Sequence, residues 1–193
     1  MEEEAVAQVG VYRLGSAQEP WDWVCWEDQV VEIGFRFGKE RAPPNSQFPR
    51  LLPLGLSRRK RGADVPTHQM MTCLCVSGRV FGAIAKFLTK QDQVFPLKSD
   101  LGEYYAINVL RYVDCLDPRN CAAQWAEGEE FVNPYTIWKF AFRPGTVPRA
   151  AVFRIPEFHP DILITEPVAA AIRDSGAQGY RLDGPWPAAD PVD

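Results

Sequence analysis

The side chains of this sequence that are equipped for chemistry include two histidines, five cysteines and a closely spaced pair of aspartates. His68 and His159 each stand next to a loop that contains proline. A hydrolytic triad needs a nucleophile, an imidazole and an orienting acid within hydrogen-bonding reach, and no Gly-x-Ser-x-Gly turn supplies the nucleophile here. We therefore expect no catalytic histidine.

Cys73 and Cys75 are the candidate metal ligands, because a strand would place both thiols on one face. Zinc sites usually separate paired ligands by about two to four residues instead. Cys25 or His68 would have to complete such a site, whereas small buried thiols are the more common outcome. No glycine-rich phosphate-binding loop is present either. We expect neither a metal nor another cofactor.

Asp114 and Asp117 form a carboxylate pair that would suit acid–base chemistry if their surroundings separated the two pKa values. The residues Asp117-Pro118-Arg119-Asn120 are also typical of a turn in which Asp117 holds the first position and bonds to backbone amides. We favour the turn. A small enzyme of unknown chemistry that uses Asp114 and Asp117 stays open as an alternative.

The composition is that of a globular protein with one sizeable core, since 46% of the 193 residues are hydrophobic and 24% are charged. None of the apolar runs reaches about eighteen residues, the length that a membrane-spanning helix needs. The start, Met1-Glu2-Glu3-Glu4, is acidic where a secretion signal would be basic. We expect a cytosolic protein with no membrane partner, and the modest, odd number of cysteines predicts reduced thiols.

Charge is divided unevenly along the chain. Residues 1–97 carry twelve basic and eleven acidic groups, whereas residues 98–193 carry nine basic and fourteen acidic groups, a net charge of −5. An acidic half repels nucleic-acid phosphates and favours a basic protein partner. Solubility alone would also account for a surplus of this size. We expect no nucleic-acid partner.

A proline-rich loop separates two parts of the chain. The segment Lys39–Pro66 contains five prolines, which exclude long regular elements. Its basic run Arg58–Arg61 is more typical of a solvated turn than of a contact with nucleic acid. We expect a single domain over residues 1–193, in which residues 1–66 form an N-terminal lobe and the loop, and residues 67–193 form the main α+β core.

Hydrophobic periodicity predicts two helices. Ser77 can cap a helix over Gly78–Leu88, and Pro167 suits the first turn of a second helix over Pro167–Ser175, which Gly176 ends. Each helix lies between two predicted strands, so the chain contains two similar strand–helix–strand units. The predicted strands are Gly10–Leu14, Gln29–Phe37, Met70–Val76, Gln93–Leu97, Tyr104–Arg111, Tyr135–Phe142, Ala151–Ile155, Asp161–Thr165 and Gly179–Leu182.

These elements predict an α+β fold with a predominantly antiparallel sheet and two main helices, because strands outnumber helices and most links are too short for crossover helices. Alternation along Tyr135–Phe142 would place Thr136 and Trp138 on the face that carries Phe140 and Phe142. The predicted core residues are Trp138, Phe140, Phe142, Val109, Ile162 and Ile164.

The segment Glu103–Asp117 combines aromatic and aliphatic residues with a single asparagine and ends in two aspartates. It resembles the central signature of immunity protein family eleven of bacterial polymorphic toxin systems, whose members are encoded beside toxins and neutralise them. The resemblance continues over Phe153–Pro156, Asp161–Thr165, Pro167–Ser175 and Gly179–Leu182, and so covers roughly the second half of the chain. The family often has a serine shortly after the last aspartate, where this chain has Cys121.

The resemblance implies a non-catalytic cytosolic protein that binds one cognate toxin. The positions that match the family resemble residues that define its fold, and none of them is assigned here as a toxin contact. They are Tyr104, Tyr105, Asn108, Val113, Asp114, Asp117, Ile155, Pro156, Ile162 to Thr165, Gly179 and Tyr180. A structural subunit of a secretion-related assembly is a further alternative.

An acidic segment of the second half is the predicted toxin-binding site. Glu127, Glu129 and Glu130 can steer a basic toxin, and the neighbouring Trp125 and Phe131 can anchor it. A solvated loop between strands is the alternative explanation of this cluster.

Overall fold

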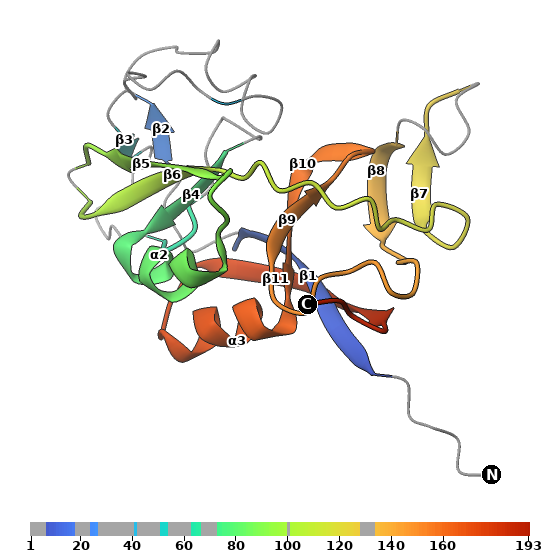
Figure 1. The fold of residues 1–193 in the computed structure, drawn as a ribbon. Helices are drawn as coiled ribbons and strands as arrows, with labels where there is room; N and C mark the ends of the chain where they lie inside the picture. Colours follow the sequence, from blue (N-terminus) through green and yellow to red (C-terminus); the bar gives the residue numbers. More distant parts are fainter. Residues whose placement is uncertain are drawn as a thin grey trace.

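Strands dominate the computed structural model of this protein (Figure 1). The described residues are 7–17, 24–26, 41, 51–53, 63–66, 73–99, 101–127 and 134–193. In chain order, the elements are β1 Gln8–Ser16, β2 Val24–Trp26, β3 Leu51–Pro53, β4 Leu74–Ser77, α2 Gly78–Ile84, the 3-10 turn η1 Ala85–Phe87, β5 Gln93–Leu97, β6 Tyr104–Asn108, β7 Ala122–Trp125, β8 Pro134–Lys139, β9 Val152–Ile155, β10 Phe158–Thr165, α3 Glu166–Asp174 and β11 Tyr180–Ala189.

The predicted α+β class and antiparallel pairing are confirmed, but the described strands form four antiparallel sheets where one sheet was predicted. Both predicted helices are present, the first as α2 continued by η1 and the second as α3. The Ser77 hydroxyl caps α2 by accepting a bond from the Val80 N–H at 3.4 Å. Gly176 follows α3 with a φ of +71°, a conformation that favours glycine at a helix end.

The strand β6 is shorter than the predicted strand Tyr104–Arg111, because it ends at Asn108. The Asp92 carboxylate accepts the backbone N–H groups of Leu110 and Arg111 at 2.7 and 3.3 Å. These N–H groups are therefore taken by a side chain, and the ladder stops.

Other boundaries also differ from the prediction. The strand expected over Gly179–Leu182 continues as β11 to Ala189, and β7 occupies a segment for which no strand was predicted. The predicted strand Gln29–Phe37 lies outside the described residues, as do the first three residues of Met70–Val76.

A four-stranded antiparallel sheet, in the order β11-β1-β10-β9, forms the middle of the molecule (Figure 1). Its strand β1 pairs with both neighbours, so that Val11 lies opposite Thr165 on one side and Trp186 on the other. Because side chains alternate along a strand, Tyr12 packs against one face of the sheet and Val11 against the other. The sheet thus separates two hydrophobic cores.

The first core lies between the central sheet, the two helices and the three-stranded sheet β4-β6-β5, and the second lies between the central sheet and the β7–β8 hairpin. The predicted core residues Val109, Ile162 and Ile164 are buried in the first, and Phe140 and Phe142 are buried in the second. These five predictions are confirmed.

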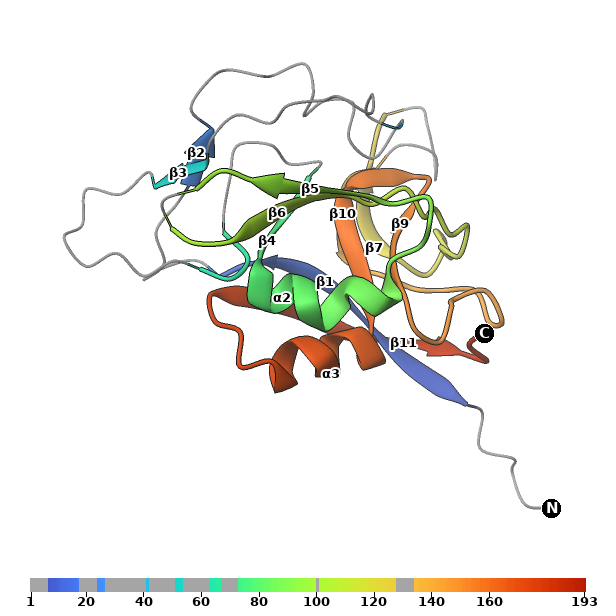
Figure 2. The same cartoon turned by 60° about the vertical axis from the view of Figure 1, so that its left-hand side comes forward.

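The two predicted strand–helix–strand units are present, and they share one arrangement in the structure. In the first unit, β4 and β5 flank β6 and pair antiparallel with it; in the second, β10 and β11 flank β1 in the same way. Their helices, α2 and α3, lie side by side (Figure 2). The units differ in the position of the middle strand along the chain: β6 comes after β4, α2 and β5, whereas β1 comes before β10, α3 and β11.

Candidate functional site

The β7–β8 hairpin contains Trp125, the first of the predicted toxin-binding residues. It stands apart from the helices, beyond the central sheet (Figure 1). Its antiparallel register places Ala122 opposite Lys139 and Ala123 opposite Ile137. One step along β7 therefore corresponds to two steps along β8, and the residue between them, Trp138, has no opposite residue.

A second irregularity occurs one pair further along the hairpin. Gln124 lies opposite Thr136, and the next residue, Trp125, lies opposite Pro134, so Tyr135 is also extra. Strand β8 thus contains two β-bulges. Bulges of this kind redirect side chains and break the alternation of a strand.

The two residues at the bulges are the large hydrophobic side chains that β8 exposes. Tyr135 is 68% exposed and Trp138 is 60% exposed. The intervening Ile137 is fully buried. Two aromatic rings therefore face solvent on a strand that Ile137 anchors in the second core.

The prediction that Trp138 belongs to the core is wrong, and the bulge is the physical reason. Unbroken alternation would have placed Thr136 and Trp138 with Phe140 and Phe142. The extra residue shifts the phase of the strand by one, so Ile137 shares the buried side with Phe140 and Phe142. Nothing in the residue types marks the bulge, since β8 contains no glycine.

The structure describes two of the five predicted toxin-binding residues. Trp125 ends β7 and packs, half-buried, against the second core, and Glu127 is exposed just beyond it. Glu129, Glu130 and Phe131 lie outside the described residues.

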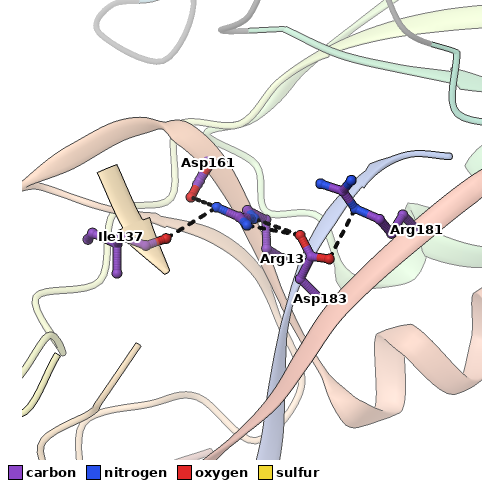
Figure 3. Close-up of polar contacts among 5 residues, drawn as sticks. All are labelled: Arg13, Ile137, Asp161, Arg181 and Asp183. Atoms are coloured by element: carbon purple, nitrogen blue, oxygen red, sulfur yellow. Dashed lines mark hydrogen bonds and ion pairs between the residues drawn. The ribbon is translucent and has the colours of Figure 1, made fainter. Parts of the chain in front are cut away.

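Arg13 connects the hairpin to the central sheet (Figure 3). From β1, its Nη1 donates to the Ile137 carbonyl oxygen of β8 at 3.4 Å and pairs with Asp161 Oδ2 of β10 at 3.2 Å. Its Nε and Nη2 donate to Asp183 Oδ2 of β11 at 3.1 and 2.9 Å. Arg181 pairs with the other oxygen of Asp183 at 3.0 Å. One guanidinium thus joins three strands of the sheet to the base of the hairpin.

The charges in this network are held together despite partial burial. Burial by itself lowers the pKa of Arg13, but the attraction of Asp161 and the bond to Asp183 outweigh it and raise that pKa. Burial raises the pKa of Asp161, although Arg13 opposes the change. Because Arg13 has two carboxylate partners, its charge is compensated, and the link to Ile137 is held in place.

The two aspartates that were candidate acid–base residues have local structural partners. Asp114 forms a salt bridge with Arg143 at 2.6 Å. The predicted turn after Asp117 is confirmed, because the Asn120 N–H donates to the Asp117 carbonyl at 3.2 Å and the Asn120 side-chain amide donates to the Asp117 carboxylate at 2.7 Å.

The thiols of Cys73, Cys75, Cys115 and Cys121 are free, and the first three are buried. Burial raises the pKa of Cys73 to about 12 and also raises that of Cys75, so both thiols are protonated at neutral pH and are weak nucleophiles. In the described part of the chain, no three His, Cys, Asp or Glu side chains are grouped as metal ligands. His68 and the side chain of His159 lie outside that part.

Within the described ranges, neither helix has the length and the apolar character needed to span a membrane. No curated protein matches the sequence. The family model described as "Immunity protein family (Imm11)" matches residues 17–184, which confirms the resemblance of the central and C-terminal segments and extends it toward the N-terminus. Since this match covers most of the 193 residues, the chain belongs to the Imm11 immunity protein family.

Proposed function

We propose that this protein neutralises a cognate bacterial toxin by binding it, and that the β7–β8 hairpin provides the binding surface. Membership in an immunity protein family supports the toxin-neutralising role. We choose the hairpin as the binding surface because Tyr135 and Trp138 are exposed at its two bulges.

Exposed aromatic rings are well suited to hold a protein partner. Tyrosine and tryptophan are enriched among the few residues that carry most of the free energy of an interface. The bulges fix the backbone on which Tyr135 and Trp138 stand, and Ile137 anchors it between them. Less conformational entropy is lost on binding when side chains project from such an ordered strand.

Acidic residues near the tip of the hairpin would add attraction over a longer range. Glu127 is exposed directly after β7, and Glu129 and Glu130 follow it in the sequence. We propose that these carboxylates, with Trp125 and Phe131, take part in binding the toxin. They would speed the approach of a basic toxin, and they would repel nucleic acid.

The proposed mechanism is stoichiometric blocking in the cytosol, without catalysis or a cofactor. The local bonds of Asp114 and Asp117 favour a structural use of both carboxylates. We propose that a gene beside this one encodes the toxin, as the resemblance to the family implies, and that toxin domain is the natural probe.

The test is co-expression of that toxin domain with the full chain, combined with binding measurements on the purified proteins. We expect the wild type to restore growth and to bind the toxin. The double variant Tyr135→Ala, Trp138→Ala should weaken binding about 30-fold or more, since each anchor of an interface is worth roughly 1–2 kcal/mol. Val94→Ala, at an exposed apolar residue of β5, is the matched control and should bind like the wild type.

The acidic segment is tested in the same assay by charge reversal. Glu129→Lys combined with Glu130→Lys should slow association, with a larger effect at low salt. Wild-type protein that neither protects cells nor binds the toxin would refute the proposed function. Full protection by the Tyr135→Ala, Trp138→Ala variant would leave the function standing and would remove the hairpin as its site.

A further inference from the structure

In the part of the chain that the structure describes, β7 is an edge strand. Among the residues that the structure describes, β7 pairs with β8 alone. On the other side of the hairpin, Arg13 donates to the Ile137 carbonyl and so occupies the outer edge of β8 (Figure 3). The hairpin is thus closed on the β8 side and open on the β7 side.

The register identifies which backbone groups point outward from β7. Opposite residues in an antiparallel pair alternate between hydrogen-bonded and non-hydrogen-bonded pairs. Trp125 lies opposite Pro134, which has no N–H, so this pair is not hydrogen-bonded, and the next pair, Gln124 with Thr136, is. Ala123, opposite Ile137, is then again in a non-hydrogen-bonded pair, and its N–H and C=O point away from β8.

The bond from Arg13 supports this assignment independently. It shows that the Ile137 carbonyl is directed away from β7, as a non-hydrogen-bonded pair with Ala123 requires. The Ala123 side chain packs toward the second core. An adjacent strand would therefore meet the Ala123 backbone groups without displacing a side chain.

Three other edge strands of the described sheets, β11, β5 and β9, are protected against such pairing. Pro185 and Pro187 remove N–H groups from β11, and Pro96 does so on β5. On β9, the Arg154 N–H donates to the Arg111 carbonyl at 2.9 Å, so a loop of the same chain covers the strand. By contrast, β7 contains neither a proline nor a charged residue. Exposed edges of this kind accept an additional strand.

We propose that an extended segment of the cognate toxin adds to the outer edge of β7 as a further strand and bonds to the N–H and C=O of Ala123. This inference rests on the proposed function and adds the mode of binding. The segment carries lysine or arginine, because a strand along β7 passes beside the exposed Glu127. Backbone pairing would then supply affinity, and the rings on β8 would supply selectivity.

The decisive variant is Ala123→Pro, which removes the outward N–H and places the proline ring on the open edge. The hairpin does not use this N–H, so the variant should fold, which circular dichroism and thermal unfolding check. Binding of the toxin domain encoded beside this gene should weaken about tenfold or more. Ala123→Ser keeps the N–H and is the matched control, with an affinity within about twofold of the wild type.

Hydrogen exchange of the wild-type protein tests the same contact without a substitution. In the free protein, the Ala123 N–H should exchange faster than the Gln124 N–H, which bonds to β8. In the complex, exchange at Ala123 should slow about tenfold or more, while Gln124 stays protected.

Two results would overturn strand addition while leaving the proposed function intact: unchanged exchange at Ala123 in a complex that does form, or undiminished binding by folded Ala123→Pro protein. A wild-type homodimer that Ala123→Pro dissociates would also overturn it, by assigning the edge to a second copy of this chain. Failure of the wild type to bind the toxin at all refutes the proposed function itself.

Discussion

Trp138 and Phe140 are large aromatic residues two positions apart, yet the bulge gives them opposite environments. Trp138 is 60% exposed, and Phe140 is buried against Phe142 and Trp186. We predict that Trp138→Ala lowers the free energy of unfolding by less than about 1 kcal/mol, whereas Phe140→Ala lowers it by roughly 3–5 kcal/mol. Urea unfolding of both variants measures the difference.

The same two variants separate stability from binding. Trp138→Ala should lose affinity for the toxin at nearly unchanged stability, which a core position cannot do. A loss of stability for Trp138→Ala that matches that for Phe140→Ala would contradict the exposed position of this ring.

Burial was predictable from the sequence where alternation is unbroken. Ile162 and Ile164 stand on one face of β10, and both are buried as expected. Alternation could not locate Trp138, because a bulge is a property of the backbone register between two strands. Arg154 shows another limit: it is fully buried and donates from Nε to the Val109 carbonyl at 3.0 Å, although residue type alone would place an arginine at the surface.

The pairing of β1 with β11 depends on Gly184 of β11. Gly184 has a φ of +126°, and a Cβ at this position would lie 2.7 Å from the Val11 carbonyl oxygen. We predict that Gly184→Ala lowers the free energy of unfolding by roughly 2–4 kcal/mol, through backbone strain and displacement of β1. The midpoint of thermal or urea unfolding measures this loss.

Gly15 provides the control within the same pair of strands. A Cβ at Gly15 would meet no atom within 4 Å. Gly15→Ala should therefore change the stability by no more than about 0.5 kcal/mol. If both alanine variants lost the same free energy of unfolding, the close approach of Gly184 to Val11 would not be the cause of the loss in Gly184→Ala.

At the scale of elements, the sequence predicted both helices because their signals are local: Ser77 before α2, and Pro167 and Gly176 around α3. It did not predict β7, whose small residues carry no clear alternation. The length of β11 was also missed, since its two prolines argue against a strand unless an edge position tolerates them. Pairing partners, and not local preferences, define these strands.

At the scale of the whole molecule, buried ionisable groups predict a loss of stability at alkaline pH. Burial raises the pKa of Cys73 from 9.0 to about 12 and that of Tyr104 from 10.0 to about 12. The unfolded chain therefore releases these protons first as the pH rises. The stabilising contribution is complete below pH 9 and is lost toward pH 12, at about 1.4 kcal/mol per pH unit for each group inside its window.

Urea unfolding between pH 8 and about 10.5 under reducing conditions tests this prediction. In that pH range, the buried groups that the unfolded chain begins to deprotonate are cysteine thiols and tyrosine phenols. Cys73→Ala removes one titrating group, so its stability should fall less steeply with pH than that of the wild type. Parallel curves of stability against pH for the two proteins would show that Cys73 titrates in the same range in the folded and unfolded states.

The division of residues 1–66 from residues 67–193 stays a prediction at this scale.

The position of β1 between β10 and β11 has a consequence for the timing of protection. Tyr12 of β1 bonds to Glu166, 154 positions further along the chain, and β1 also pairs with β11 up to Ala189. During synthesis, β1 leaves the ribosome long before its neighbours exist, so the central sheet can close only after the chain has been made as far as Ala189. At about 5–20 residues per second, that takes roughly 10–40 s for 193 residues. Under the proposed function, this interval is the shortest delay between the start of synthesis of this chain and any protection by it.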